Sequence, residues 1–74
     1  MKTYKWNLDI ILKNSGVIIP AIYEGPERGS QDVFEKIFTN KAPNHIIGLG
    51  CNNGNSNVFV LAGEIASVDI YPEK

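Results

Sequence analysis

The sequence is poor in the residues that small domains use as cross-links. Its 74 residues include one cysteine, Cys51, and one histidine, His45. A single cysteine cannot form a disulfide within the chain, and these two residues alone cannot supply the four ligands of a structural zinc site. A domain of this length buries only about 60% of its unfolded surface and usually gains stability from disulfides, a metal or oligomerisation. With the first two excluded, the sequence predicts a homo-oligomer.

The chain also lacks a strong charge of either sign and a long hydrophobic run. Seven Lys and Arg residues stand against eight Asp and Glu residues, which gives a formal net charge of −1. The basic residues are scattered, so the pattern of a phosphate-binding surface is missing and nucleic acid is not an expected partner. Without a membrane-spanning run or a secretory signal, we expect one cytoplasmic domain, 1–74, with no membrane contact.

Period-two alternation predicts a first β-hairpin. Between positions 4 and 12 the even residues are apolar and most odd residues are polar, which is typical of a strand with one buried face. Residues 14–16 predict a three-residue hairpin loop whose glycine adopts a positive φ. The returning strand covers residues 17–23, in a register that places Leu8 opposite Ile22 so that the apolar faces of the two strands coincide.

The returning strand is apolar on both faces. In the predicted register Ile18 and Ile22 point toward the core, and a second apolar set points the other way. An uncovered apolar face requires another element of the chain or another subunit to pack on it. We therefore predict that this second face is an oligomer surface, formed by Val17, Ile19, Ala21 and Tyr23.

One short helix and three further strands complete the predicted fold. Apolar residues at helical spacing follow Ser30, a good N-cap residue, and predict a helix over residues 31–39. Strands are predicted over 45–51, 57–61 and 65–71. The fold class is therefore α+β and mainly β, in the order β-β-α-β-β-β. Five short strands of this kind favour a strongly bent antiparallel sheet or a small SH3-like barrel.

Two stretches resemble Sm-like proteins, a family of small β-barrels. Residues 8–16 (LDIILKNSG) are similar to the first strand and turn of that family, and residues 57–60 and 64–68 are similar to its fourth and fifth strands. The resemblance implies an oligomeric ring that binds RNA. The chain departs from the family because its helix lies between the second and third strands instead of before the first. The base-binding Asp and Asn residues and the Arg-Gly motif of the family are not evident.

No catalytic or cofactor-binding pattern emerges. The segment 48–54 is rich in glycine but lacks the third glycine of a dinucleotide-binding fingerprint and the Gly-Lys-Ser/Thr of a P-loop. His45 and Cys51 lie on one predicted strand about 20 Å apart, which is too far for a Cys–His catalytic pair. The sequence therefore predicts no enzyme, no metal site and no cofactor.

Two polar segments supply the candidate binding residues. An asparagine cluster follows the third predicted strand, and its amides both donate and accept hydrogen bonds. A second loop, after the returning strand, carries an aromatic residue and a cation. Binding residues concentrate on loops that a rigid sheet holds in place. The predicted recognition residues are accordingly Asn52, Asn53, Asn55, Asn57, Tyr23 and Arg28.

These observations favour a small non-enzymatic interaction protein. The Asn-, Ile- and Lys-rich sequence and the small size are typical of proteins encoded by phages and prophages of low-GC Gram-positive bacteria. Such an accessory factor is expected to bind a host protein, with an immunity component among the options, or to sequester a small ligand between subunits. The alternative is the Sm-like ring that binds RNA.

Overall fold

The computed structural model describes residues 2–51 and 56–73, which form one antiparallel sheet and one α-helix. The predicted order β-β-α-β-β-β is confirmed. The break predicted between the last two strands is a short 3-10 turn, η1. The elements are β1 (Tyr4–Leu12), β2 (Ile18–Gly25), α1 (Ser30–Phe38), β3 (Ile46–Cys51), β4 (Asn57–Leu61), η1 (Ala62–Glu64) and β5 (Ile65–Pro72).

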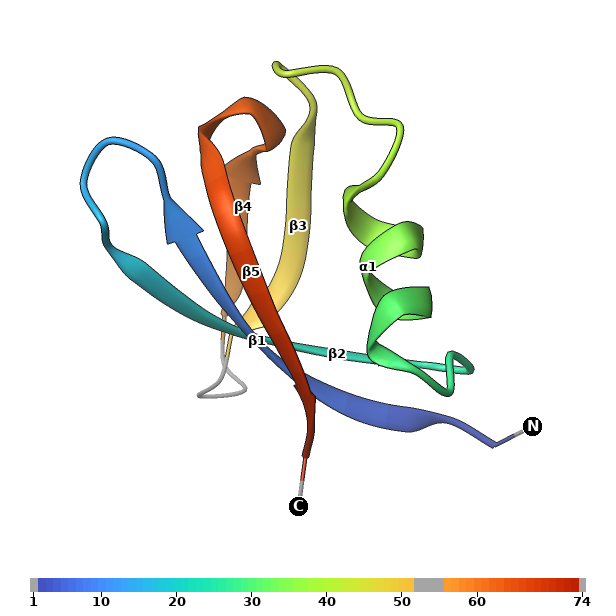
Figure 1. The fold of residues 1–74 in the computed structure, drawn as a ribbon. Coiled ribbons are helices and arrows are strands. Elements are labelled where there is room, and N and C mark those ends of the chain that lie inside the picture. The colour runs from blue at the N-terminus through green and yellow to red at the C-terminus, as the bar shows by residue number, and fades with distance from the viewer. Residues whose placement is uncertain (1, 52–55, 74) are drawn as a thin grey trace.

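The five strands follow the spatial order β4-β3-β2-β1-β5, so β4 and β5 are the two edges of an open, bent sheet. β1 pairs along most of its length with both β2 and β5. The pairing between β2 and β3 is short, and among the described residues it joins only Ala21 to Cys51 and Ile22 to Gly50. The β3–β4 hairpin therefore stands away from the other three strands, and α1 lies beside it (Figure 1).

The register of the β1–β2 hairpin differs by one residue from the predicted one. Leu8 pairs with Ala21 and not with Ile22. The loop holds four residues instead of three, because the Leu12 N–H donates to the Val17 carbonyl at 3.1 Å. A slip of one residue exchanges the two faces of a strand. The predicted core face of β2 is therefore its outer face, and the predicted outer face looks into the core.

This exchange corrects the predicted oligomer surface. Ala21 is only 2% exposed and belongs to the core, and Ile19 and Tyr23 are half-buried and pack against it. Val17 lies in the hairpin connection and is 50% exposed. Three of the four residues thus line the inside of the bent sheet, where they belong to the core or pack against it.

The ends of α1 also differ slightly from the prediction. Gly29, not Ser30, is the N-cap residue, and its carbonyl accepts a hydrogen bond from the Val33 N–H at 3.1 Å. The helix ends at Phe38, and Asn40 follows with a φ of 59°. Asparagine tolerates this left-handed conformation, which is common just after a helix. The helix is therefore only nine residues long.

The core fills the concave side of the sheet. Its central side chains, Leu8, Ile10 and Val33, are fully buried. The Trp6 indole N–H donates to the Glu27 carbonyl at 3.3 Å, which satisfies its one polar atom and attaches the β2–α1 loop to β1. The buried cluster comprises Trp6, Leu8, Ile10, Ala21, Val33, Ile37, Ile47, Leu49 and Val60.

A matched pair of truncations tests this placement of the core. Leu8→Ala removes a fully buried side chain and leaves a cavity, so it should lower the free energy of unfolding by about 2–5 kcal/mol. Ile18→Ala truncates a side chain that is 58% exposed on the outer face of β2, and its effect should be less than about 1 kcal/mol. Chemical denaturation measures both, and a larger loss for Ile18→Ala than for Leu8→Ala would contradict the register.

Candidate functional site

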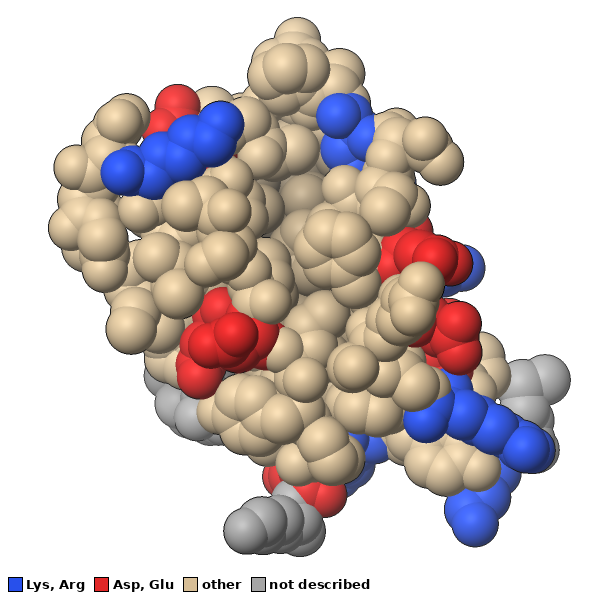
Figure 2. All heavy atoms as spheres, viewed as in Figure 1, with Lys and Arg blue, Asp and Glu red and all other residues tan. Residues whose placement is uncertain are grey.

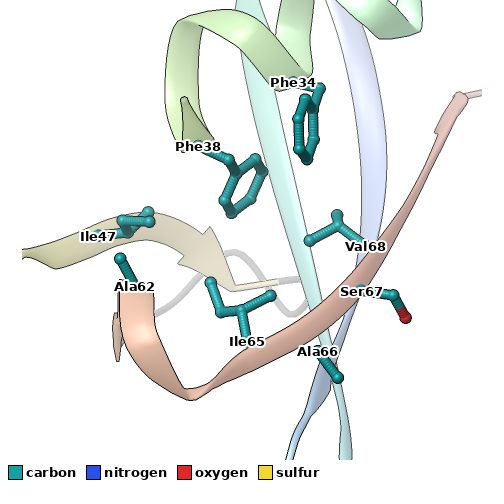
Figure 3. A pocket seen from close by; sticks show the side chains of 8 residues that line it. All are labelled: Phe34, Phe38, Ile47, Ala62, Ile65, Ala66, Ser67 and Val68. Atoms are coloured by element: carbon teal, nitrogen blue, oxygen red, sulfur yellow. The ribbon is translucent and has the colours of Figure 1, made fainter. Parts of the chain in front are cut away.

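An apolar groove lies between α1 and β5. Its main part is a cavity of about 410 Å³. In Figure 3 the Phe34 and Phe38 side chains project from α1 toward β5, and Val68 and Ile65 project from β5 toward them, whereas the Ser67 side chain points away. The cavity is lined by Phe34, Phe38, Ile47, Ala62, Ile65, Ala66, Ser67 and Val68.

The spacing of residues on α1 places the two phenylalanines at the groove. Val33 and Ile37 occupy the face of the helix that is buried against the sheet. Phe34 and Phe38 follow them by one position, so they lie four residues apart on the neighbouring face. Their rings stack with centroids 5.6 Å apart. Phe34 is still 42% exposed, and the helix therefore presents an aromatic pair that its own core does not fully bury.

A second cavity of about 340 Å³ continues the groove toward the start of the helix. It shares Phe34 and Val68 with the first cavity. The two cavities together follow β5 from Ile65 to Ile70, which corresponds to about 17 Å of extended chain. The site is therefore an elongated groove, which is lined at its far end by Ser30, Gln31, Asp69 and Ile70.

The groove is almost free of charge. Asp69 is the one charged residue among those that line the two cavities. Figure 2 shows this side of the molecule as a mainly uncharged, hollowed surface, with most charged side chains toward its margin. An apolar centre with a charged margin is the usual composition of a surface that binds another protein.

A third, smaller cavity lies where β2 and β3 separate. It has a volume of about 240 Å³ and is lined in part by Tyr23, Lys36, Lys41 and His45. The Tyr23 hydroxyl donates to Glu27 Oε1 at 2.7 Å. Burial, followed by this hydrogen bond and the charge of Glu27, raises the pKa of Tyr23 to about 12. The same hydrogen bond lowers the pKa of Glu27.

Gly25 makes room for this hydrogen bond. A Cβ atom added at Gly25 would lie 2.5 Å from both the Tyr23 hydroxyl oxygen and Glu27 Oε1. Any larger residue must therefore displace one of the two partners. The Tyr23–Glu27 pair closes the loop between β2 and α1, and so it helps to fix the start of the helix that carries the groove.

The structure separates the recognition residues predicted from the sequence. Tyr23 lines the third cavity, and Arg28 is exposed in the loop before α1. Asn57 is exposed at the start of β4, two strands away from β2. The other three predicted residues, Asn52, Asn53 and Asn55, lie outside the described residues. Tyr23, Arg28 and Asn57, the three that the structure describes, do not line the apolar groove.

Sequence reasoning missed the groove because its phenylalanines also fit a buried helical stripe. Val33, Phe34, Ile37 and Phe38 recur at helical spacing, a pattern that is equally typical of four residues buried against a sheet. The feature of the sequence that distinguishes a partly exposed Phe34 and Phe38 from a fully buried stripe is the width of the apolar stripe. Two adjacent pairs of large apolar residues are more than a nine-residue helix can bury on one face.

Comparisons with protein-family models, with curated proteins and with solved structures find no match to this chain. In the part of the chain that the structure describes, no helix is long and apolar enough to cross a membrane. Residues 2–51 and 56–73 also contain no group of three or more His, Cys, Asp or Glu side chains that could hold a metal ion. The geometry of the surface is therefore the basis for the functional proposal.

The raised pKa of Tyr23 makes its hydrogen bond testable. Because this pKa of about 12 lies above the ordinary value of 10.0, the neutral phenol stabilises the folded state fully below pH 10. That stabilisation is lost as the pH rises through about 12. Alkaline titration of phenolate absorbance should show a tyrosine ionising near pH 12, and Tyr23→Phe should remove that step while leaving the ionisation of Tyr71, whose pKa burial and Asp9 also raise. The assignment is contradicted if Tyr23→Phe keeps the ionisation step near pH 12 and instead loses absorbance change at lower pH.

Proposed function

We propose that this chain is a non-enzymatic interaction protein whose α1–β5 groove binds an apolar segment of a partner protein. The observation that carries the proposal is the half-exposed aromatic pair Phe34–Phe38, which faces an apolar strand across an elongated cavity. A few residues in well-packed, desolvated pockets carry most of the binding energy at protein interfaces, and aromatic residues are enriched there. The groove needs no rearrangement to admit two or three apolar side chains of a partner.

The lining favours a polypeptide over a small polar ligand. Small-molecule sites combine an apolar cavity with several polar groups that converge on the ligand and orient it. Here the Ser67 side chain points away from the aromatic pair, and no Lys, Arg or His lines the groove. A nucleotide would therefore find no cation for its phosphates. A basic residue beside the apolar segment of the partner would be complementary to Asp69, which lines the second cavity at one end of the groove.

Selection from a library of random peptides tests this proposal. We expect the enriched peptides to carry two or more large apolar residues and a flanking Lys or Arg. In a titration followed by NMR, a synthetic peptide of this kind should shift the signals of Phe34, Phe38, Ile65 and Val68. Phe34→Lys should weaken binding by at least about tenfold, because it places a charge in the apolar centre of the groove.

Val17→Lys is the matched control for this experiment. It introduces the same charge at a residue that is 50% exposed, close to the 42% of Phe34, but lies in the β1–β2 connection. Peptide affinity should be unchanged in this variant. The proposal is wrong if no peptide is enriched, or if the enriched peptides bind Phe34→Lys as well as the unmodified protein.

Oligonucleotide binding separates this proposal from the alternative of an RNA-binding ring. Two lysines, Lys36 and Lys41, line the smaller third cavity together with His45, and none of the three lines the groove. Nucleic-acid affinity at low salt depends on several phosphate contacts to cations. We therefore expect no change in the fluorescence anisotropy of labelled oligo-U or oligo-A at low salt. Binding that weakens as salt is added would instead favour the ring.

A further inference from the structure

The two edges of the sheet are protected to very different degrees. An edge strand exposes unpaired backbone groups, and natural proteins usually block such an edge with a charge, a proline, a bulge or a covering element. β5 has all four of these devices. Its register to β1 shifts between Ile11 and Leu12, Asp69 and Pro72 lie within it, and α1 packs beside it.

β4, the other edge, carries no charge, proline or bulge among the described residues, and the element that packs against it most extensively is its hairpin partner β3. The sequence of β4 is Asn-Val-Phe-Val-Leu, and its register to β3 runs without a shift. Phe59 is 68% exposed and Leu61 is 42% exposed. An unblocked edge strand with exposed apolar side chains is a template for pairing with another strand.

The backbone hydrogen bonds show which groups of β4 are directed outward. The Cys51 N–H donates to the Ser56 carbonyl at 2.9 Å, and the Ala62 N–H donates to the His45 carbonyl at 2.9 Å. Backbone groups alternate between the two sides of a strand. The even-numbered residues of β4 therefore pair with β3. Three residues direct their N–H and C=O groups toward the free edge, namely Asn57, Phe59 and Leu61.

We propose that a second copy of this chain pairs with β4 in an antiparallel β4–β4 dimer. The three outward residues are spaced symmetrically about Phe59, so a twofold axis at Phe59 satisfies all of them at once. The two Phe59 residues exchange both of their hydrogen bonds, and Asn57 of each copy pairs with Leu61 of the other. This self-complementary pattern is what a symmetric dimer requires, and it selects a second copy as the occupant.

The side chains on the outer face of this hairpin extend the contact. Phe59 lies over Gly48 on the neighbouring strand, since a Cβ atom at Gly48 would come within 3.0 Å of the Phe59 ring. Across the twofold axis the two Phe59 rings become a cross-strand aromatic pair. Ile46, which is 61% exposed, pairs with Leu61 and borders the contact.

The size of this apolar surface sets the strength of the dimer. The exposed parts of Ile46, Phe59 and Leu61 amount to roughly 300 Å² on each copy. The two copies thus contribute about 600 Å² of apolar surface, to which the two backbone edges add, so the contact lies below the roughly 1,200 Å² at which standard specific interfaces begin and in the range of weak, transient ones. We therefore expect a dimer that dissociates on dilution. The proposal is independent of the groove, which β4 does not line.

Light scattering coupled to size-exclusion chromatography tests the dimer directly. At high concentration the mass should be twice the 8.2 kDa of one chain, and it should fall toward that value on dilution. Phe59→Lys should give a monomer at every concentration, because it places two like charges opposite each other. Val17→Lys, the control, should remain dimeric, and circular dichroism should show that both variants are folded.

Hydrogen exchange of the unmodified protein gives a second readout that does not depend on any variant folding. The amides of Val58 and Val60 should be protected at all concentrations, because they pair with β3. The amides of Phe59 and Leu61 should become protected only at concentrations where the dimer forms. A mass of 8.2 kDa at all concentrations, fast exchange at Phe59 throughout, or a Phe59→Lys protein that still dimerises would each overturn the proposal. A larger ring or a mixed complex as the native assembly would do the same.

Discussion

The fold depends on the burial of one face of β1. β1 is hydrogen-bonded along both edges, to β2 on one side and to β5 on the other, and its Trp6, Leu8 and Ile10 side chains form the centre of the core. The strands on either side align their own apolar residues with these three. With neither a disulfide nor a metal site within the described residues, this burial is the main source of stability in a chain of 74 residues.

The groove follows from the covering of that core by a single short helix. A bent sheet encloses a concave surface, and a nine-residue helix spans only about 14 Å. Val33 and Ile37 cover the core, but the helix does not fill the space along β5. The aromatic pair next to them then has one side packed and the other side open. Incomplete coverage thus produces a preformed apolar site.

The sequence predicted what periodicity alone determines and missed what depends on packing. The alternation in β1 and the helical spacing in α1 identified both elements within a residue or two. The register of β2 was not determined, because Ile18 and Ile22 on one face are as apolar as Ile19 and Ala21 on the other. One extra loop residue then decided which face was buried. The groove was not predicted, because the width of the apolar stripe on α1 indicates that part of it stays exposed, whereas spacing alone does not show which residues those are.

The two proposed surfaces depend on different structural features, and these lie in different parts of the fold. Recognition in the groove relies on side chains from α1 and β5, whereas self-association relies on the backbone edge of β4. η1 joins these regions, and it is held by hydrogen bonds from the Ala62 and Gly63 N–H groups to the His45 and Pro43 carbonyls. Because a Cβ atom at Gly63 would lie 2.9 Å from Pro43, this turn is closely packed. A closely packed turn fixes the position of the groove relative to the free edge of β4. A symmetric dimer would therefore hold its two grooves at a fixed distance and orientation. Such a dimer would bind a partner that carries two apolar segments at two points at once.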